Sequence, residues 1–452
     1  MYILLDLDGT LTDTAHPKFK NYKDGVEDFS SAEIPIINGA IDFINKLRSL
    51  NHKLFIVSDS HPRYVKKIAN EIFGFEVFDN KANYNSNNFD YQDNVIWLTD
   101  KPNTEKTTHQ ILAHLNYINN CNSNKISDFN LDDFIMIGDS WLDIELGRRL
   151  NIATVLTSFY TINQSDIEVR DGIGEGWKPI KTGPTYYANS YDDILKITED
   201  RIGQLLAIEA VFQNIDSDNM VKFLYRNSKK GFIAFRCLAR QEDGECDKYA
   251  RADQYYQIDN PERTRELKDK LAKGISNYLK RVEKYPQIHW DYFTYVSDKS
   301  TTRPPNKLKE IFDLIETKFY KTKIFEWNAD VQGSLRNRPN YAERRSFIKD
   351  NLFINTDNDL NGKNIIVLDD QFTSSATAYE ICNQLRDKGV RNILFVAMFY
   401  LILPIFSKEC PKCKKPLKIK INKTKGTKFY SCTPPQFKGD GCGYTENILE
   451  NA

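Results

Sequence analysis

The hydrophobic positions of this chain fall into short unbroken runs, separated by stretches with helical spacing. Such runs cover residues 2–5, 53–57, 95–98 and 134–137. A short apolar run without helical period is typical of a buried strand. Residues 40–50, between the first two runs, have helical spacing and predict a helix. Strands that alternate with helices predict an α/β fold with a parallel sheet.

The pattern returns in the second half. Residues 292–297, 363–368 and 392–399 are apolar runs, with helical patterns between them. Between the two halves, residues 232–238 are strand-like and residues 262–285 form a charged helical pattern, without a chemical motif. We therefore expect four parts. They are a first α/β domain over 1–200, a connecting module over 201–287, a second α/β domain over 288–405 and a cysteine-rich segment over 406–452.

Composition changes this picture little. Of the 452 residues, 40% are apolar and 27% are charged, and the formal net charge is zero, which is ordinary for a globular protein. The longest apolar run, residues 393–406, is too short to cross a bilayer and contains a proline. A predicted strand at residue 2 leaves no room for a signal peptide. Only eight cysteines occur, four of them clustered. We expect a reducing, cytoplasmic location without membrane contact.

Two acids follow the first predicted strand. Asp6 and Asp8 come directly after residues 2–5 and precede Gly9 and Thr10. Ligands of open α/β sheets bind beyond the carboxyl ends of the strands, and residues two apart in an extended stretch point to one side. One carboxylate could therefore attack phosphorus while the other protonates the leaving oxygen, with a divalent cation offsetting their charge. The alternative is a strand end with two solvated acids.

Later strand ends carry further polar residues. Ser58 follows the second strand, Lys101 follows the third, and Asp139 and Asp143 follow the fourth. Because Asp139 and Asp143 are four residues apart at a strand-to-helix turn, both can face one side. Together with the acids after the first strand they would form an oxygen-rich site suited to Mg²⁺. Ser58 could equally be a helix N-cap, and Lys106 is the alternative to Lys101.

These four strand ends, in this order, resemble the four motifs of the haloacid dehalogenase (HAD) superfamily of phosphatases. The resemblance implies a Rossmann-like domain in which Asp6 is the nucleophile and Asp8 the proton donor and acceptor. Ser58 and Lys101 would hold the phosphoryl oxygens. The implied Mg²⁺ ligands are Asp6, Asp8, Asp139 and Asp143. The intervals between the motifs leave little room for a cap, which implies a large substrate or a cap from another domain or subunit.

The strand at residues 363–368 runs into a second acidic pair. Asp369 and Asp370 precede a hydroxyl-rich loop over residues 373–377 and the start of a helix. Loop N–H groups and a helix N-terminus bind phosphate, and paired carboxylates accept hydrogen bonds from ribose hydroxyls. The alternative is a strand-turn-helix with incidental acids.

This second stretch resembles the phosphoribosyl-pyrophosphate (PRPP) loop of type I phosphoribosyltransferases, with Ser375 where glycine is usual. Residues 332–347 are similar to the mobile segment of the competence-associated (ComF-like) branch. The loop at 298–306 would take the diphosphate, with Lys299 and Arg303 as its cations. The implied PRPP-binding residues are Asp369, Asp370, Thr373, Ser374, Ser375, Ala376, Thr377 and Lys299.

The clustered cysteines have metal-ligand spacing. Cys410, Cys413, Cys432 and Cys442 form two pairs around a lysine-rich stretch, and four thiolates are the usual ligands of structural Zn²⁺. The pattern resembles the zinc ribbons at the ends of bacterial type I topoisomerases. Residues 408–438 contain ten lysines and one acid, so nucleic-acid binding and a structural zinc clip with a solvated lysine face are both open.

Three functions remain as hypotheses. The first is a bifunctional nucleotide-metabolism enzyme that hydrolyses a nucleotide or sugar phosphate at one head and binds PRPP or transfers phosphoribose at the other. The second is a nucleic-acid end-processing phosphatase, favoured by the absent cap and the basic ribbon. The third is a nucleotide-sensing regulator, favoured by Ser375. A homodimer is open in each case.

Overall fold

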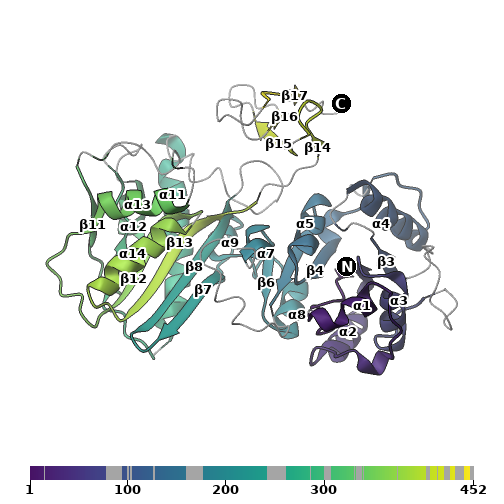
Figure 1. Cartoon of the computed structure of the whole chain (residues 1–452). Helices are drawn as coiled ribbons and strands as arrows, with labels where there is room; N and C mark the ends of the chain where they lie inside the picture. Colours follow the sequence, from purple (N-terminus) through teal and green to yellow (C-terminus); the bar gives the residue numbers. More distant parts are fainter. Residues whose placement is uncertain are drawn as a thin grey trace.

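The computed structural model shows two α/β units side by side and a small β-ribbon above them (Figure 1). The amino terminus lies in the first unit and the carboxyl terminus beside the ribbon. The residues that the structure describes are 1–14, 16–77, 94–98, 101, 104–125, 128–158, 177–241, 261–285, 287–299, 307–329, 331, 338, 341–373, 375–403, 408–414, 416–421, 428–432 and 442–447.

The first unit is built on a parallel six-stranded sheet with the order β3-β2-β1-β4-β5-β6. The four apolar runs of the first half form the adjacent strands β3, β2, β1 and β4 of this sheet, which confirms the α/β expectation. The strands are β1 (Tyr2–Leu5), β2 (Lys53–Ser58), β3 (Val95–Trp97), β4 (Phe134–Gly138), β5 (Ala153–Thr157) and β6 (Tyr186–Ala188).

Helices cover both faces of this sheet. Successive residues of a strand point to opposite faces, so Ile3 and Leu5 pack with α2, α3 and α8, whereas Leu4 packs with α4 and α5. Helix α8 ends at Glu199, and the chain turns at Gly203 before α9 (Ala207–Phe212) begins. These helices are α2 (Ala40–Ser49), α3 (Pro62–Glu71), α4 (Thr104–Asn119), α5 (Trp141–Arg149) and α8 (Tyr191–Glu199).

The second unit has a five-stranded sheet with the order β7-β8-β13-β12-β9, parallel except for the β7–β8 hairpin. Its strands are β7 (Val221–Ser228), β8 (Gly231–Gln241), β9 (Tyr292–Tyr295), β12 (Asn364–Phe372) and β13 (Asn392–Leu401). Its helices are α9 (Ala207–Phe212), α11 (Pro261–Glu283), α12 (Lys307–Leu314) and α14 (Ala376–Asp387).

This sheet changes the expected role of residues 201–287. Instead of a separate connecting module, they contribute β7, β8 and α11 to the second unit. Strand β8 pairs with β13 from Ile233 to Gln241, and Leu271, Ile275 and Leu279 of α11 are buried against the sheet. The helical spacing of α11 was visible in the sequence, but the partner of its apolar face was not.

Two smaller sheets complete the structure. Strands β10 (Phe325–Trp327) and β11 (Leu352–Ile354) form an antiparallel pair beside α13 (Tyr341–Asn351). The ribbon is an antiparallel sheet of β14 (Lys408–Glu409), β15 (Pro416–Ile421), β16 (Lys428–Cys432) and β17 (Thr445–Asn447). Among the described residues, none of the helices combines the length and apolar character needed to cross a bilayer.

Buried polar groups join the two α/β units. Arg148 of α5 is 3% exposed and donates a hydrogen bond of 2.8 Å to the carbonyl of Leu403. Arg240 of β8 and Glu209 are both fully buried and paired, and Arg240 also donates to Gly183 of the first unit at 3.3 Å. Because buried charges are stable only when paired and hydrogen-bonded, these contacts hold the units in one arrangement.

Candidate functional sites

Three acids of the first unit meet at the carboxyl edge of its sheet. Asp6 follows β1, and its N–H donates to Ile137 of β4 at 2.9 Å, which fixes it beside the end of that strand. Asp139 and Asp143 lie at the turn from β4 to α5. Carboxylate oxygens of Asp6, Asp139 and Asp143 lie within 4.8 Å of one another. The sequence predicted this convergence because carboxyl ends of adjacent parallel strands share one edge.

Gly9 makes this close approach possible. Its φ is +82°, and a Cβ atom there would lie 2.3 Å from Oδ2 of Asp139. A side chain would therefore both strain the backbone and collide with the carboxylate. Asp143 is held from the other side, because its Oδ2 accepts hydrogen bonds from the N–H of Ser140 at 3.1 Å and from its hydroxyl at 2.8 Å.

Lys101 joins the acids from the segment after β3. Its side chain is 3% exposed, and its ammonium contacts Asp6 and lies 2.7 Å from Oδ1 of Asp143. Thr10 also donates to Asp6, at 3.3 Å. The side chain of the alternative, Lys106, lies outside the described residues. The structure thus places the ammonium of Lys101 between the carboxylates of Asp6 and Asp143.

Burial dominates the electrostatics of this cluster. It raises the pKa of Asp6 well above its ordinary value, and the Asp143 carboxylate raises it further against the opposing effect of Lys101. Burial also raises the pKa of Asp139 to about 8, again with Asp143 adding to it. Burial lowers the pKa of Lys101. The negative charges of Asp143, Asp6 and Asp59 together outweigh this effect, so the pKa of Lys101 lies well above its ordinary value.

The donor set of this cluster fits a hard divalent cation. One ammonium faces three crowded carboxylates, so the acids repel one another unless protons or a further cation offset their charge. Carboxylate oxygens at a strand-to-helix turn are the ligands that Mg²⁺ takes in phosphate-handling sites. Asp6, Asp139 and Asp143 are therefore the residues able to hold it.

Asp8 has a different environment from the other three acids. Its Oδ2 accepts a hydrogen bond of 2.8 Å from Ser60, and its Oδ1 accepts one of 2.8 Å from Tyr64 and another from Thr14. Burial raises the pKa of Tyr64 far above its ordinary range, and the negative charge of Asp8 adds to this. The structure brings Asp8 to the same edge of the sheet but groups its side chain with hydroxyls.

The sequence did not single out these three hydroxyl residues. Ser60 lies two residues past the predicted Ser58, and Tyr64 lies one turn into α3. Ser58 itself is 1% exposed at the end of β2, and its Oγ accepts from the N–H of Ser60 at 3.2 Å. The spacing from Ser60 to Tyr64, one helical turn, was the available signal, but it becomes meaningful only once Asp8 is placed opposite.

The second candidate site lies at the carboxyl end of β12. Asp369 is 6% exposed, and burial raises its pKa well above the ordinary value, with the neighbouring Asp370 adding to this. Asp298, beyond the adjacent strand β9, accepts a hydrogen bond of 2.9 Å from the N–H of Leu308. Burial raises the pKa of Asp298 to about 6, and Asp370 contributes. Three acids thus face one region, of which the sequence predicted two.

The predicted phosphate loop lies between β12 and α14. Ser375 is buried at the N-cap of α14 with φ +59°. This left-handed conformation suits glycine, which is the residue usual in the family that the loop resembles. Ala376 and Thr377 lie in the first turn of α14, and Thr373 is the first residue of the loop. Ser374 lies outside the described residues.

The ammonium of Lys299 lies over two aromatic rings. Its ammonium lies 4.6 Å from the ring centre of Trp327 and 4.4 Å from that of Phe347, and Arg338 also stacks on Phe347, at 5.0 Å. Burial lowers the pKa of Lys299 to about 8, and Arg338 contributes. Its predicted diphosphate partner would have to approach this aromatic patch. Arg303, the other predicted cation, lies outside the described residues.

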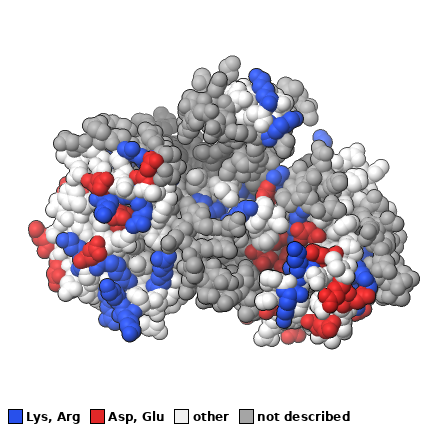
Figure 2. All heavy atoms as spheres, viewed as in Figure 1, with Lys and Arg blue, Asp and Glu red and all other residues white. Residues whose placement is uncertain are grey.

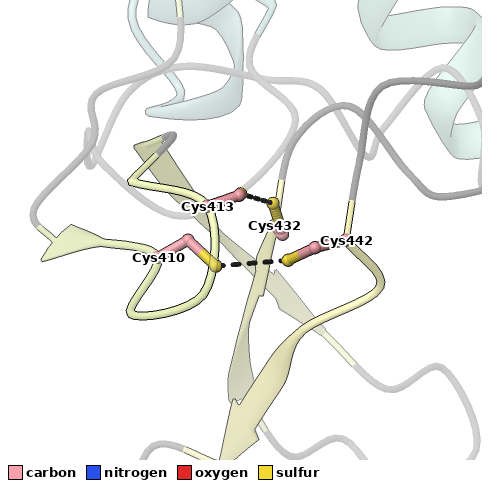
Figure 3. A group of neighbouring side chains, drawn as sticks. All are labelled: Cys410, Cys413, Cys432 and Cys442. Carbon is pink, nitrogen blue, oxygen red and sulfur yellow. Dashed lines mark hydrogen bonds between the residues drawn. The ribbon is translucent and has the colours of Figure 1, made fainter.

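Four cysteine thiols converge in the ribbon (Figure 3). The sulfur atoms of Cys410 and Cys442 are 3.3 Å apart, as are those of Cys413 and Cys432. A disulfide requires about 2.05 Å, so all four are thiols, and their sulfurs lie within 4.8 Å of one another. Four thiols on a small antiparallel sheet fit a tetrahedral Zn²⁺, as the spacing predicted.

Comparison with known proteins finds similarity only among solved structures. No family model and no curated protein matches the chain. A hydrolase from Pseudomonas syringae is 16% identical over 44% of this chain and 98% of its own, with a TM-score of 0.29. A HAD-superfamily hydrolase from Ehrlichia chaffeensis is 17% identical over 37% of this chain and 93% of its own, with a TM-score of 0.22.

A hypoxanthine phosphoribosyltransferase from Staphylococcus aureus is 11% identical over 29% of this chain, with a TM-score of 0.20. This chain covers 62% of that transferase, less than two thirds of its length. Solved structures of both kinds are similar to parts of this chain.

Proposed function

We propose that this chain is a two-headed enzyme of nucleotide metabolism. The first unit would hydrolyse a phosphomonoester, and the second would bind a ribose phosphate of the PRPP type or transfer its phosphoribosyl group. The contact of Lys101 with both Asp6 and Asp143 is the observation that carries the first half. It joins residues from three separate segments in the arrangement that phosphoryl transfer needs.

The proposed hydrolysis has two steps. A carboxylate oxygen of Asp6 bonds to phosphorus while the ester P–O bond breaks, and the leaving oxygen takes a proton from Asp8. Water then attacks the aspartyl-phosphate and gives its proton to Asp8, which frees Asp6 and releases inorganic phosphate. The hydroxyls of Ser60, Tyr64 and Thr14 would hold Asp8 toward the leaving oxygen.

Charge stabilisation would come from both sides of the phosphoryl group. Lys101 would orient and stabilise its oxygens, and Ser58, at the end of the neighbouring strand, would donate to them. Asp6, Asp139 and Asp143 would hold Mg²⁺, which would offset the negative charge that builds up on the phosphoryl oxygens. Without a cation, the pKa of Asp139, raised to about 8, favours the protonated form of this carboxyl near neutral pH.

In the second head, Asp369 and Asp370 would accept hydrogen bonds from ribose hydroxyls. The loop over residues 373–377 and the N-terminus of α14 would take the 5′-phosphate. Four thiolates of the ribbon would hold Zn²⁺ in a structural role. Nucleic-acid binding by the ribbon stays a prediction from its lysines.

A sensing role for the second head is the second candidate. The positive φ of Ser375 favours it, because a side chain in the phosphate loop would weaken PRPP binding and leave a site for a weaker ligand. Release of pyrophosphate from PRPP and a base would contradict this role.

The test of the first head is phosphate release from a panel of nucleotides, sugar phosphates and 5′-phosphorylated oligonucleotides, with and without Mg²⁺. We expect Mg²⁺-dependent release that Asp6→Asn abolishes. The matched control is Asp42→Asn, an exposed acid of α2 outside the site. Release confined to oligonucleotide ends would instead favour the end-processing function, and release that survives Asp6→Asn would overturn the proposal.

A further inference from the structure

A cavity of about 390 Å³ lies between the two α/β units. Residues of the first unit line one side of it, at the carboxyl ends of β4 and β5, and residues of β7 and α11 line the other. Its volume falls within the range of about 300–1,000 Å³ typical of small-molecule sites. Its position at the carboxyl edge of a parallel sheet is where such folds bind ligands.

One end of the cavity belongs to the proposed phosphatase site. Asp139, one of the three clustered acids, lines it. Beside it lies Thr157, the last residue of β5, whose neighbour Leu156 pairs with Gly138. Thr157 is 1% exposed, and its hydroxyl has no hydrogen-bond partner among the described residues. A buried hydroxyl without a hydrogen-bond partner destabilises the folded state. An oxygen atom of a ligand in the cavity would supply that partner.

The opposite wall is basic. Lys222 of β7 and Arg281 of α11 are the two cations that line the cavity. Arg281 pairs with Asp218 at 3.1 Å, whereas Lys222 makes no ion pair within the described part of the chain. Burial lowers the pKa of Lys222, and the positive charges of Arg236 and Arg281 lower it further. An anion beside Lys222 would relieve this repulsion.

The remaining acid of the lining, Asp193, acts on Lys222, because its negative charge raises the pKa of that lysine. Asp193 accepts a hydrogen bond of 3.0 Å from the N–H of Asn189 and lies 3.9 Å from Lys196. The visible face of the first unit carries many acidic side chains (Figure 2), and both cations of the cavity come from the second unit. The lining also includes the amides of Gln204 and Asn219 and the apolar Met220.

We infer that this cavity is the leaving-group pocket of the phosphatase site and takes phosphomonoesters whose leaving group carries a second anionic group. The inference rests on the proposed function of the first head. The phosphate to be removed lies at the Asp139 end, Thr157 binds an oxygen of the leaving group, and Lys222 and Arg281 bind the second anion. Residues of β7 and α11, in the second unit, thus enclose this site from the side opposite the first unit.

The test compares two esters that differ only in the second anion. Phosphate release is measured from adenosine 5′-monophosphate and from adenosine 3′,5′-bisphosphate, with the wild-type chain, Lys222→Gln and Arg281→Gln. We expect the wild type to have the lower KM for the bisphosphate. Each variant should raise that KM about tenfold, as expected for losing a hydrogen bond to a charged group, and so reduce the preference for the bisphosphate over the monophosphate.

The controls separate a lost charge from a damaged fold. Lys222→Arg should restore the low KM, and Lys229→Gln, an exposed lysine in the turn after β7, should behave as the wild type. Equal KM values for both esters in the wild type, or KM values that Lys222→Gln leaves unchanged, would overturn the inference.

Binding separates this inference from the proposed activity. Calorimetric titration of Asp6→Asn with adenosine 3′,5′-bisphosphate should show binding that the added Lys222→Gln weakens about tenfold. If no phosphate is released but this binding is seen, the pocket stands and the phosphatase function fails. If phosphate release depends on Asp6 but Lys222→Gln leaves the affinity for the bisphosphate unchanged, the pocket assignment is wrong and the phosphatase function stands.

Discussion

The ammonium of Lys181, in the first α/β unit, donates a hydrogen bond of 2.9 Å to the backbone carbonyl of Thr373, in the second. Thr373 opens the predicted phosphate loop, and Lys181 is only 6% exposed. The carbonyl of Leu403 accepts from Arg148, which lies in the same helix, α5, as the acid Asp143. A chain of contacts therefore runs from one candidate site to the other across the interface.

Replacing Lys181 should loosen the phosphate loop. Lys181→Met leaves the carbonyl of Thr373 without its donor, and an unsatisfied buried group costs about 1–3 kcal/mol. We expect a free energy of unfolding lower by that amount and weaker binding of PRPP to the second head. Urea denaturation and calorimetric titration measure the two effects. The exposed Lys196→Met is the control, and unchanged PRPP binding in Lys181→Met would contradict the prediction.

The same lysine predicts a dependence of stability on pH. Burial lowers the pKa of Lys181 to about 8, from an ordinary value of 10.5. Between these values the unfolded chain binds the proton and the folded chain does not, so this group makes stability rise as pH increases from about 8 to about 10.5. Unfolding measured across that window should show a steeper rise for the wild type than for Lys181→Met. An equal pH dependence of the free energy of unfolding in the two proteins would contradict the lowered pKa of Lys181.

Removing Lys101 should affect both stability and activity. Lys101→Met leaves the carboxylates of Asp6 and Asp143 buried without their cation, and breaking a buried ion pair costs about 3–5 kcal/mol. We expect the free energy of unfolding in Mg²⁺-free buffer to fall by that amount. The rate of phosphate release should fall at least about 100-fold, the usual effect of removing a charge-stabilising donor. Lys46→Met, on the exposed face of α2, should change neither quantity.

Ser375 should respond to substitutions according to its backbone conformation. At φ +59° the Cβ atom of Ser375 is strained against the backbone, which costs a non-glycine residue about 1–2 kcal/mol. Ser375→Gly should therefore raise the free energy of unfolding by up to that amount, whereas Ser375→Val should lower it, because a β-branched residue is disfavoured further in this region. If the side chain also obstructs the phosphate, Ser375→Gly should tighten PRPP binding, which calorimetric titration measures. Tighter binding by Ser375→Val would contradict this reading.

The ribbon should depend on its metal and the α/β units should not. Its buried core is small and consists of Leu417 with Cys410 and Cys432. A core of this size needs a bound metal or a disulfide to stabilise the fold. We expect one bound Zn²⁺ per chain by native mass spectrometry. Cys413→Ser should abolish it and expose the ribbon to protease, while Cys121→Ser, at an exposed thiol elsewhere, should not. An unchanged digestion pattern in Cys413→Ser would argue against a zinc-dependent ribbon.

Much of the first site was predictable because its parts are local. Asp6, Asp139 and Asp143 each follow a short apolar run, and such runs identify strands without knowledge of the rest of the chain. Once the strands are parallel neighbours, their carboxyl ends must meet, so the acids converge. The four cysteines were predictable for the same reason, since two close pairs need only one hairpin to bring them together.

The remaining features depend on segments that are distant in sequence. Nothing near residues 221–241 indicates that β8 pairs with β13, which lies about 160 residues further on. The hydroxyls of Ser60 and Tyr64 belong to Asp8 only because α3 packs beside β1. Lys181 meets Thr373 only because the two units share an interface. Local sequence patterns indicate which residues are buried or exposed and where strands end. Which buried faces pack against each other is decided by the free energy of packing the whole chain.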